Sequence, residues 1–381
     1  MSKLFILGAG ASFGSSLSNC PPLMNGFIAK SKELGIYYNY DHLWYLINKL
    51  GYSNSFINSK YFNFEKVFSE LQILSSGIWH KNQYDYEHDY GEPFLVCTPV
   101  NWLKHFICET LSKTCIEARN IQCSYHDKLC SILDTNDTIV SLNYDTIIDE
   151  SLLSSNMFNE TTGYGFIIYK NKNSFETKQV SNSPVLLLKL HGSLNWEILE
   201  EIKESENSQM HRRNQSIRYR LNKLNDFEVT ISNVEEIEKR HPLDYMDPSK
   251  PQSNLEFKHD FMSMGGLDKF FQRLIVPPTF SKTDSLNSSI FDSIWHKFRE
   301  SLLSARQIYF IGTSFPDTDY HLLTMIKFYL NSRNDNFELF NINPDSRYNL
   351  EQNSFSKLQT ILPNKNINNV ALELDKFVSN L

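Results

Sequence analysis

Short apolar segments recur along the chain, each followed by a turn that carries Gly, Asn, Pro, Ser or Asp. Their length suits strands that are buried on both faces of a parallel sheet. Segments with apolar residues at helical spacing, such as 291–302 and 322–330, lie between several of them. This alternation predicts an α/β protein, a Rossmann-like open parallel sheet with helices on both faces. The expected strands are Lys3–Leu7, Thr138–Leu142, Val185–Leu190, Leu274–Val276, Gln307–Ile311 and Glu338–Ile342.

Two long insertions interrupt these strands within a single domain that spans residues 1–381. Residues 28–133 contain no clear core strand, and their apolar positions repeat at helical spacing, which predicts a helical insertion. Residues 197–266 run from an acidic stretch into a basic one and predict a polar insertion. After residue 355 the pattern is only that of short helices.

The composition is that of a globular chain, with 41% apolar and 13% aromatic residues. A formal net charge of -7 argues against a broad basic face for nucleic-acid phosphates, so no direct nucleic-acid binding is expected. The six cysteines lie between Cys20 and Cys130 without a C-x-x-C pair, which favours reduced thiols. With no signal peptide and no stretch approaching the roughly 18 apolar residues of a membrane span, we expect a cytoplasmic protein.

The first expected strand leads into a turn of small residues. Such a turn lets backbone N–H groups approach a phosphate at the start of a helix. Its third glycine, Gly14, falls one position late for G-x-G-x-x-G, and the acidic partner of a dehydrogenase is missing. The alternative is that the glycines serve only packing. The candidate nucleotide ligands are Gly8, Gly10, Ala11 and Ser12.

Two further strands end in polar residues: Asn143 and Asp145 follow one, and His191 and Gly192 follow the next. The carboxyl ends of parallel strands face the ligand crevice of an open α/β sheet, so these side chains are placed to touch a substrate. An imidazole also suits proton transfer at neutral pH. The alternatives are that Asp145 only caps the next helix and that His191 is structural.

The strand at 307–311 leads into Gly312, Thr313 and Ser314, and the strand at 338–342 leads into Asn343. Small hydroxyl residues before a helix suit phosphate or ribose hydroxyls, and an Asn amide can bond a ribose or an adenine edge. Further along the first of these turns, the alternative for Asp317 or Asp319 is a helix cap and nothing more.

In this order and at these spacings, the four motifs resemble the NAD-binding motifs of the sirtuin family. The stretches Asn143-Tyr144-Asp145 and Leu190-His191-Gly192-Ser193 are most similar to the sirtuin-like domains of bacterial anti-phage defence, and the resemblance spans residues 4–344. It implies NAD⁺ as the substrate and a partner such as a HerA-type ATPase or an Argonaute-like protein.

Two differences separate the chain from the deacylating sirtuins. Those proteins carry a zinc ribbon of four cysteines after the histidine, whereas no cysteine follows Cys130 here. They also have an Asp-Phe-Arg element where this chain reads Asn19-Cys20-Pro21-Pro22-Leu23. Both differences argue against deacylation and leave NAD⁺ cleavage open. Since no Cys or His cluster has ligand spacing, we expect no bound metal.

The resulting hypothesis is an NAD⁺ glycohydrolase that yields nicotinamide and ADP-ribose as an NAD-depleting effector of anti-phage defence. His191 takes a proton from a ribose hydroxyl or from a water that Asn143 orients, and Asp145 lies near the nicotinamide. The pyrophosphate lies on residues 8–12 and the adenosine on Thr313, Ser314 and Asn343, while Gly192 leaves room behind His191.

Two alternatives stay open. One is a non-catalytic sensor of NAD⁺ or ADP-ribose, which does not need His191. The other is a sirtuin-type deacylase or ADP-ribosyltransferase.

A protein that destroyed NAD⁺ freely would kill its host, so we expect gating by homo-oligomerisation or by a partner. The candidate gating surfaces are the polar insertion and the helical insertion, with Trp44, Tyr45 and Trp79 as interface aromatics.

Overall fold

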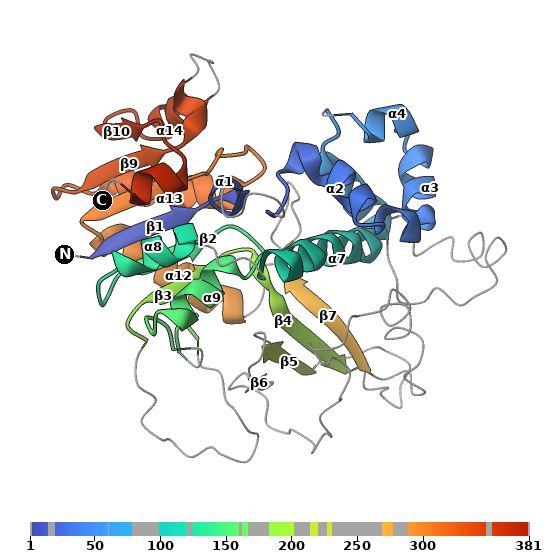
Figure 1. Cartoon of the computed structure of the whole chain (residues 1–381), viewed down its shortest axis with the longest axis horizontal. Helices are drawn as coiled ribbons and strands as arrows, with labels where there is room; N and C mark the ends of the chain where they lie inside the picture. The colour runs from blue at the N-terminus through green and yellow to red at the C-terminus, as the bar shows by residue number, and fades with distance from the viewer. Residues whose placement is uncertain are drawn as a thin grey trace.

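The computed structural model of the chain contains two sheets, helices that pack on the larger sheet, and one separate group of helices (Figure 1). No helix of the part described here has the length and apolar character needed to cross a bilayer. The structure describes residues 2–13, 20–59, 61–77, 99–119, 124–159, 162–166, 183–201, 214–219, 227–230, 269–276, 289–347 and 353–379.

Six parallel strands form the larger sheet, in the order β10-β9-β8-β1-β2-β3. Counted along the chain, this is the 3-2-1-4-5-6 order of a doubly wound Rossmann sheet, so the predicted fold class is confirmed. The order reverses between β1 and β8, which pair from Lys3 with Gln307 to Leu7 with Ile311. The strands are β1 (Lys3–Leu7), β2 (Thr138–Ser141), β3 (Leu186–Lys189), β8 (Gln307–Ile311), β9 (Glu338–Ile342) and β10 (Ile367–Val370).

Helices cover both faces of this sheet, as expected (Figure 1). Successive strands step one way from β1 to β3 and the other way from β8 to β10, so right-handed crossovers place their helices on opposite faces. The apolar side chains of β1 point to both faces, and Leu4 to Leu7 are at most 1% exposed. On one face lie α8 (Ser124–Ser131), α9 (Ile147–Ser154) and α15 (Leu374–Val378), and on the other lie α12 (Ser289–Ser304), α13 (Tyr320–Ser332) and α14 (Ser354–Ile361).

The expected helical insertion is present in the described residues and has a core of its own, which we call the helical cluster (residues 24–119). At its centre the ring of Phe27 packs edge to face on the rings of Phe64 and Phe106. Helix α8 lies outside the cluster because Leu129 and Cys130 pack into the core of the sheet. The cluster consists of η1 (Met24–Gly26), α2 (Phe27–Glu33), η2 (Tyr37–Asn39), α3 (Asp41–Lys49), α4 (Asn54–Ile57), α5 (Phe64–Gly77) and α7 (Pro99–Arg119).

Of the aromatic residues expected at an interface, Trp44 is instead part of this core. It is 4% exposed, stacks on Tyr37 at 4.4 Å and donates a hydrogen bond from Nε1 to the carbonyl of Tyr37 at 2.8 Å. Tyr45 is 42% exposed, as an interface residue would be. Trp79 lies outside the described residues.

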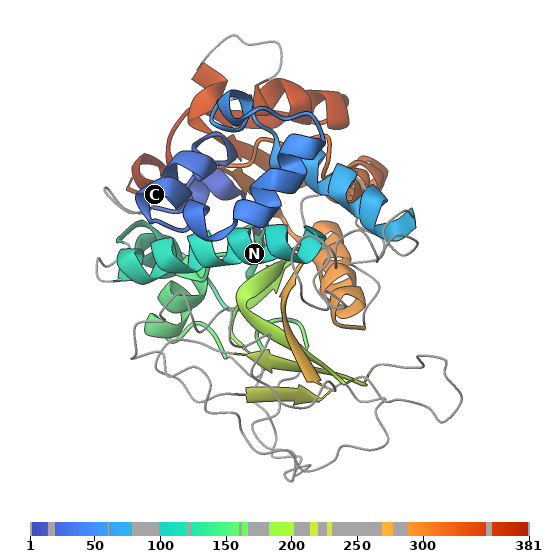
Figure 2. The same ribbon diagram turned by 90° about the vertical axis from the view of Figure 1, so that its right-hand side faces the viewer.

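A second, antiparallel sheet corrects one predicted strand. Residues Leu274–Val276 were expected in the parallel sheet, but Leu274 and Ile275 end a strand of the second sheet, because a run this short does not reveal its pairing partner. Parts of the polar insertion also form strands here. The order is β6-β5-β4-β7, with β4 (Gly192–Glu201), β5 (Asn214–Tyr219), β6 (Phe227–Thr230) and β7 (Lys269–Ile275). Figure 2 shows α7 between this sheet and the rest of the helical cluster.

The end of the chain also differs from expectation. Residues 367–370 form the edge strand β10, which the pattern did not indicate because its two central residues are Asn368 and Asn369. An edge strand is covered on fewer sides, so its sequence carries a weaker apolar signal.

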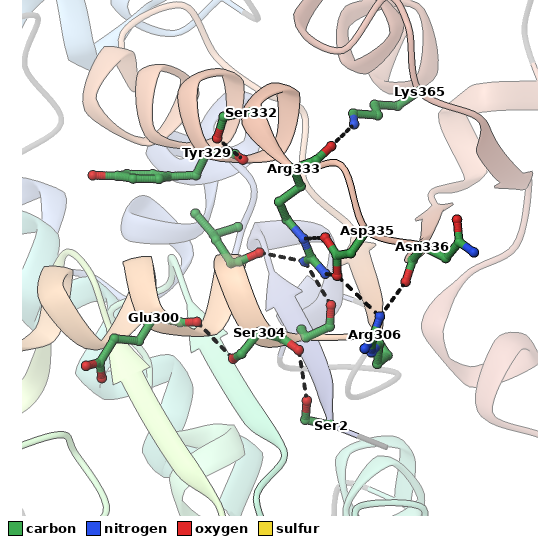
Figure 3. A network of polar contacts seen from close by, with 12 residues as sticks. Ser2, Glu300, Ser304, Arg306, Tyr329, Ser332, Arg333, Asp335, Asn336 and Lys365 are labelled. Carbon is green, nitrogen blue, oxygen red and sulfur yellow. Dashed lines mark hydrogen bonds and ion pairs between the residues drawn. The ribbon is translucent and has the colours of Figure 1, made fainter.

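At the end of the sheet opposite the carboxyl ends, Arg333 follows α13 and links the end of that helix to the end of α12 and to Asp335 (Figure 3). Its guanidinium donates to the carbonyl groups of Leu302 and Ala305, at 2.7 and 2.8 Å, where α12 ends. The same group donates to both carboxylate oxygens of Asp335 and lowers the pKa of that carboxyl group to about 2. Arg333 is 6% exposed, so it satisfies carbonyl groups that water does not reach.

Arg333→Met should lower the free energy of unfolding by about 2 to 4 kcal/mol, because it leaves buried acceptors without donors. Chemical denaturation measures this loss. Arg306→Met is the matched control, since Arg306 also bonds Asp335 but its side chain is 53% exposed; it should cost less than about 1 kcal/mol. Equal losses for the two variants would contradict the assigned role.

Stability should fall in mild acid because of His126 on α8. Burial lowers the pKa of this imidazole from 6.5 to about 4, so the folded protein keeps it neutral while the unfolded chain protonates. Stability is therefore lost as the pH falls from 6.5 to 4, by about 3 kcal/mol. His126→Gln should remove this part of the pH dependence in denaturation experiments, whereas His296→Gln, at an exposed position on α12, should retain it.

Candidate functional site

A cleft of about 1080 Å³ lies at the carboxyl ends of the parallel strands. Its floor comes from the turns after β1, β2, β3, β8 and β9, and its opposite wall includes Tyr61 to Glu65 of the helical cluster. Because the strand order reverses between β1 and β8, their following turns diverge and leave a crevice at this point. Of the site residues predicted from the sequence, all line this cleft except Ala11 and Gly192.

The glycines after β1 allow two turns to pack closely. A Cβ atom on Gly8 would lie 2.6 Å from Cα of Thr313, and one on Gly10 would lie 2.9 Å from Cα of Gly312. The amide groups of Gly8, Gly10 and Ala11 already donate to protein carbonyl groups at 2.9 Å. These glycines therefore have the packing role that the sequence left open, and a phosphate would have to use other donors.

Asn143 links the end of β2 to the turn after β1. Its amide nitrogen donates to the carbonyl of Gly8 at 2.9 Å and to Oγ of Ser12 at 2.8 Å. These contacts use the nitrogen, so the side-chain oxygen is the atom of this amide that is left to accept a hydrogen bond from a ligand or a water.

Asp145 has the helix-starting role that was the alternative for it. One carboxylate oxygen accepts from the amide of Ile147 at the start of α9, at 3.2 Å, and the side chain is buried. Its backbone carbonyl accepts from the ammonium group of Lys189. Asp145 lines the cleft, but these contacts account for its position without a substrate.

His191 lies on the floor of the cleft with both ring nitrogens in contact. Nδ1 is 3.1 Å from the carbonyl oxygen of Leu142, and Nε2 is 3.2 Å from Oδ1 of Asp319. A carbonyl oxygen only accepts, so Nδ1 must carry a proton. The contact between Nε2 and a carboxyl group then needs a second proton, held either by the imidazolium or by Asp319. The two side chains are 8% and 3% exposed, respectively, so bulk water reaches little of either.

Asp319 is a residue of the cleft that the sequence analysis did not count among its site residues, since it left open that Asp317 or Asp319 is only a helix cap. It does occupy the N-cap position of α13, yet its side chain makes no cap hydrogen bond and turns to His191 instead. An Asp at an N-cap normally stabilises the helix by about 1 kcal/mol. Because the carboxyl group of Asp319 contacts His191 and not the helix amides, we infer that its role is to interact with His191 in the cleft. One signal in the sequence could have identified it: an Asp in the turn after a strand, where the same turn already carried candidate ligands.

Thr313 and Asn343 hold the turns after β8 and β9 together. The amide nitrogen of Asn343 donates to the carbonyl of Thr313 at 2.9 Å, and its oxygen accepts from the amide of Asp345 at 3.2 Å. Both residues are buried, whereas Ser314 is exposed at the cleft. Ser314 is therefore the most accessible of the predicted ligands on this side.

The cleft has an acidic lining. Among its described residues are five carboxyl groups and no Lys or Arg. Burial, together with the charges of Cys108, Asp319 and Glu65, raises the pKa of Tyr144 well above its usual value, so its neutral hydroxyl donates to the carbonyl of Val276 at 2.6 Å. The excess of carboxyl groups along the cleft favours a cationic group of a ligand. The carboxyl groups belong to Glu65, Asp145, Asp319, Asp345 and Glu373.

A buried ion pair supports the floor of the cleft from behind. The ammonium group of Lys189 is 3.1 Å from Oδ2 of Asp149, and the hydroxyl of Tyr164 donates to Oδ1 of Asp149 at 2.5 Å. Lys189 and Asp149 are both 0% exposed. Because Lys189 also bonds the carbonyl of Asp145, this network fixes the turn after β2 to the strand that carries His191.

No known protein-family model matches the chain, and no curated protein matches its sequence. In the part of the chain that the structure covers, no group of three or more His, Cys, Asp or Glu residues could hold a metal ion.

Lys189→Met should lower the free energy of unfolding by about 3 to 5 kcal/mol, because it leaves the carboxylate of Asp149 buried without its cation. Denaturation of the purified variant measures this. The control is Lys297→Met, whose partner Glu300 is 49% exposed and whose loss should cost less than about 1 kcal/mol. If Lys189→Met were as mild as the control, the ion pair would not support the cleft.

Proposed function

We propose that the protein is a sirtuin-like NAD⁺ glycohydrolase that cleaves the bond between nicotinamide and ribose. The observation that carries this proposal is that Asn143 and the His191–Asp319 pair meet on the floor of one cleft, where the strand order of a Rossmann sheet reverses. Dinucleotides bind at this point of such sheets. The cleft volume of about 1080 Å³ is slightly above the usual range for ligand pockets, so there is room for a ligand as large as a dinucleotide.

The acidic lining suits the electronic demand of this reaction. Nicotinamide leaves as a neutral molecule, so positive charge moves from the pyridinium ring to an oxocarbenium-like ribose in the transition state. Carboxylates fixed nearby stabilise that charge, because they are oriented before the reaction begins. Two of these carboxyl groups belong to the network around the proposed acid–base residue: Asp319 contacts His191, and Glu65 accepts a hydrogen bond from Thr318, next to Asp319.

His191 is the proposed base. The contact of Nδ1 with the carbonyl of Leu142 leaves Nε2 as the ring atom that exchanges a proton. A ribose hydroxyl or an attacking water would join or replace Asp319 at Nε2, and the side-chain oxygen of Asn143 would orient that group. Because the contact between Nε2 and Asp319 already holds a proton in the free protein, that proton would have to leave to solvent before His191 takes one from the bound hydroxyl or water. Asp319 would then stabilise the imidazolium that forms.

We expect the rest of the dinucleotide to use the hydrogen-bonding groups that the turns leave available. With the amides of Gly8, Gly10 and Ala11 in use, we expect the pyrophosphate to approach this turn at Ala9, which is exposed at the cleft. The adenosine half would lie toward Ser314 and the turn of Asn343. A role as an NAD-depleting effector of anti-phage defence in the cytoplasm, with a homo-oligomer or a HerA-type or Argonaute-like partner, is part of this proposal and rests on the sequence resemblance.

A non-catalytic sensor of NAD⁺ or ADP-ribose is the second candidate. The observation that favours it is that both ring nitrogens of His191 already have protein partners. A sensor needs the cleft but no exchangeable proton at Nε2.

Nicotinamide release by the purified protein, with ligand binding measured by calorimetry, separates these candidates. For the enzyme, His191→Gln should lower kcat by about 100-fold or more while NAD⁺ still binds, because the proton acceptor is lost. Asn143→Ala should lower kcat as well and destabilise the turn after β1 by about 1 kcal/mol.

The control is His296→Gln, which lies far from the cleft on an exposed face of α12 and should keep full activity. Binding without turnover by wild type, under dilute and concentrated conditions and with candidate partners, would support the sensor. Absence of binding would refute both candidates.

A further inference from the structure

Glu65 of the helical cluster contacts the turn that carries Asp319. Its carboxylate oxygen Oε2 accepts a hydrogen bond from Oγ1 of Thr318 at 2.5 Å, across a separation of 253 residues in the sequence. Thr318 is 7% exposed and directly precedes Asp319. Glu65 itself is held in the first turn of α5, where its amide donates to Oδ1 of Asn63 at 2.9 Å. A side chain of the cluster thus reaches within one residue of the His191–Asp319 pair.

Asp319 has two possible uses for its carboxyl group. It occupies the N-cap of α13, where an Asp ordinarily accepts from the free amides of the first helical turn. In the structure it contacts Nε2 of His191 instead, at 3.2 Å. The backbone at Asp319, with a φ of -91° and a ψ of 47°, lies outside the extended region that a capping residue usually adopts, so the way the turn enters α13 bears on which contact forms.

The turn before Asp319 is already constrained at its other end. Phe315 has a φ of 47°, a conformation that bulky side chains rarely adopt. Its ring is 1% exposed and packs edge to face on Phe310 at 5.3 Å, which holds that conformation in place. With Phe315 fixed, the contact of Thr318 with Glu65 determines how the last residues of the turn enter α13.

We propose that Glu65 is a positioning residue: by holding Thr318, it keeps the carboxyl group of Asp319 on His191 and away from the cap position. The helical cluster then sets the hydrogen-bonding state of His191 without touching it. A shift of the cluster, for example on assembly, would release Thr318 and let Asp319 return to the helix. The effect on catalysis rests on the proposed function, whereas the effect on His191 does not.

The test uses the full-length protein and begins with nuclear magnetic resonance of ¹⁵N-labelled histidine rings at one neutral pH. His191→Gln assigns the ring signal, and Asp319→Asn gives the position of the Nε2 signal when the carboxylate is absent. Glu65→Ala and Thr318→Val should move the Nε2 signal of His191 toward that of Asp319→Asn. Glu65→Gln and Thr318→Ser, which keep an acceptor and a hydroxyl, should leave it near wild type.

Steady-state kinetics with NAD⁺ give a second readout. Glu65→Ala and Thr318→Val should lower kcat by about tenfold and change KM by less than about twofold, because the acid–base pair is displaced while the rest of the cleft is kept. The double variant should be no worse than the single ones, since both remove the same contact. The control is Glu70→Ala on the same helix, where Glu70 bonds Tyr52 outside the cleft; it should leave the ring signal and kcat unchanged.

Melting temperatures of all variants identify any that fail to fold, and Glu65→Ala carries the test if Thr318→Val does so. If the folded Glu65→Ala and Thr318→Val variants keep the wild-type signal of His191, the positioning role is overturned. If the signal moves as expected but wild type cleaves no NAD⁺, the positioning contact stands and the proposed function fails. The two conclusions are thus tested separately.

Discussion

The close contact between the turns after β1 and β8 is the constraint on which the cleft depends. These neighbouring strands lie where the strand order reverses, and their turns would collide if either carried larger residues: a Cβ atom on Gly312 would lie 2.4 Å from the amide nitrogen of Ala11. Gly312 also has a φ of 62°, which glycine adopts without strain. Because these two turns are fixed against each other, the side chains that follow β2 and β3 lie beside them on a cleft floor of fixed shape.

The polar groups around this floor form two networks with different physical roles. Lys189, Asp149 and Tyr164 are fully buried, so their pairing is needed for stability and leaves no group available to a ligand. His191 and Asp319 lie in contact at the surface of the cleft, where a ligand can reach them. The first network holds the scaffold, and the second lies at a position that the first determines.

The helical cluster completes the site without contributing to the core of the sheet. It closes the cleft with residues around α5, adds the carboxyl group of Glu65 to the acidic lining, and packs against Tyr144. Tyr144 also bonds Val276 at the end of the second sheet, so a single residue connects the three parts of the fold. This arrangement explains how an insertion with its own core can affect residues on the strands.

The sequence by itself determined the elements whose signal is local. Five of the six parallel strands follow from short apolar runs, because burial on both faces demands such runs, and the turns after them supplied Asn143, His191 and Asn343. The edge strand β10 was missed because it is polar, and the strand ending at Ile275 was given to the wrong sheet because pairing is not local. Only the tertiary structure showed that Asp319 pairs with His191 and that Glu65 holds Thr318. Hydrogen bonds between residues 128 and 253 positions apart leave no periodic trace in the chain, since they depend on how separate elements pack.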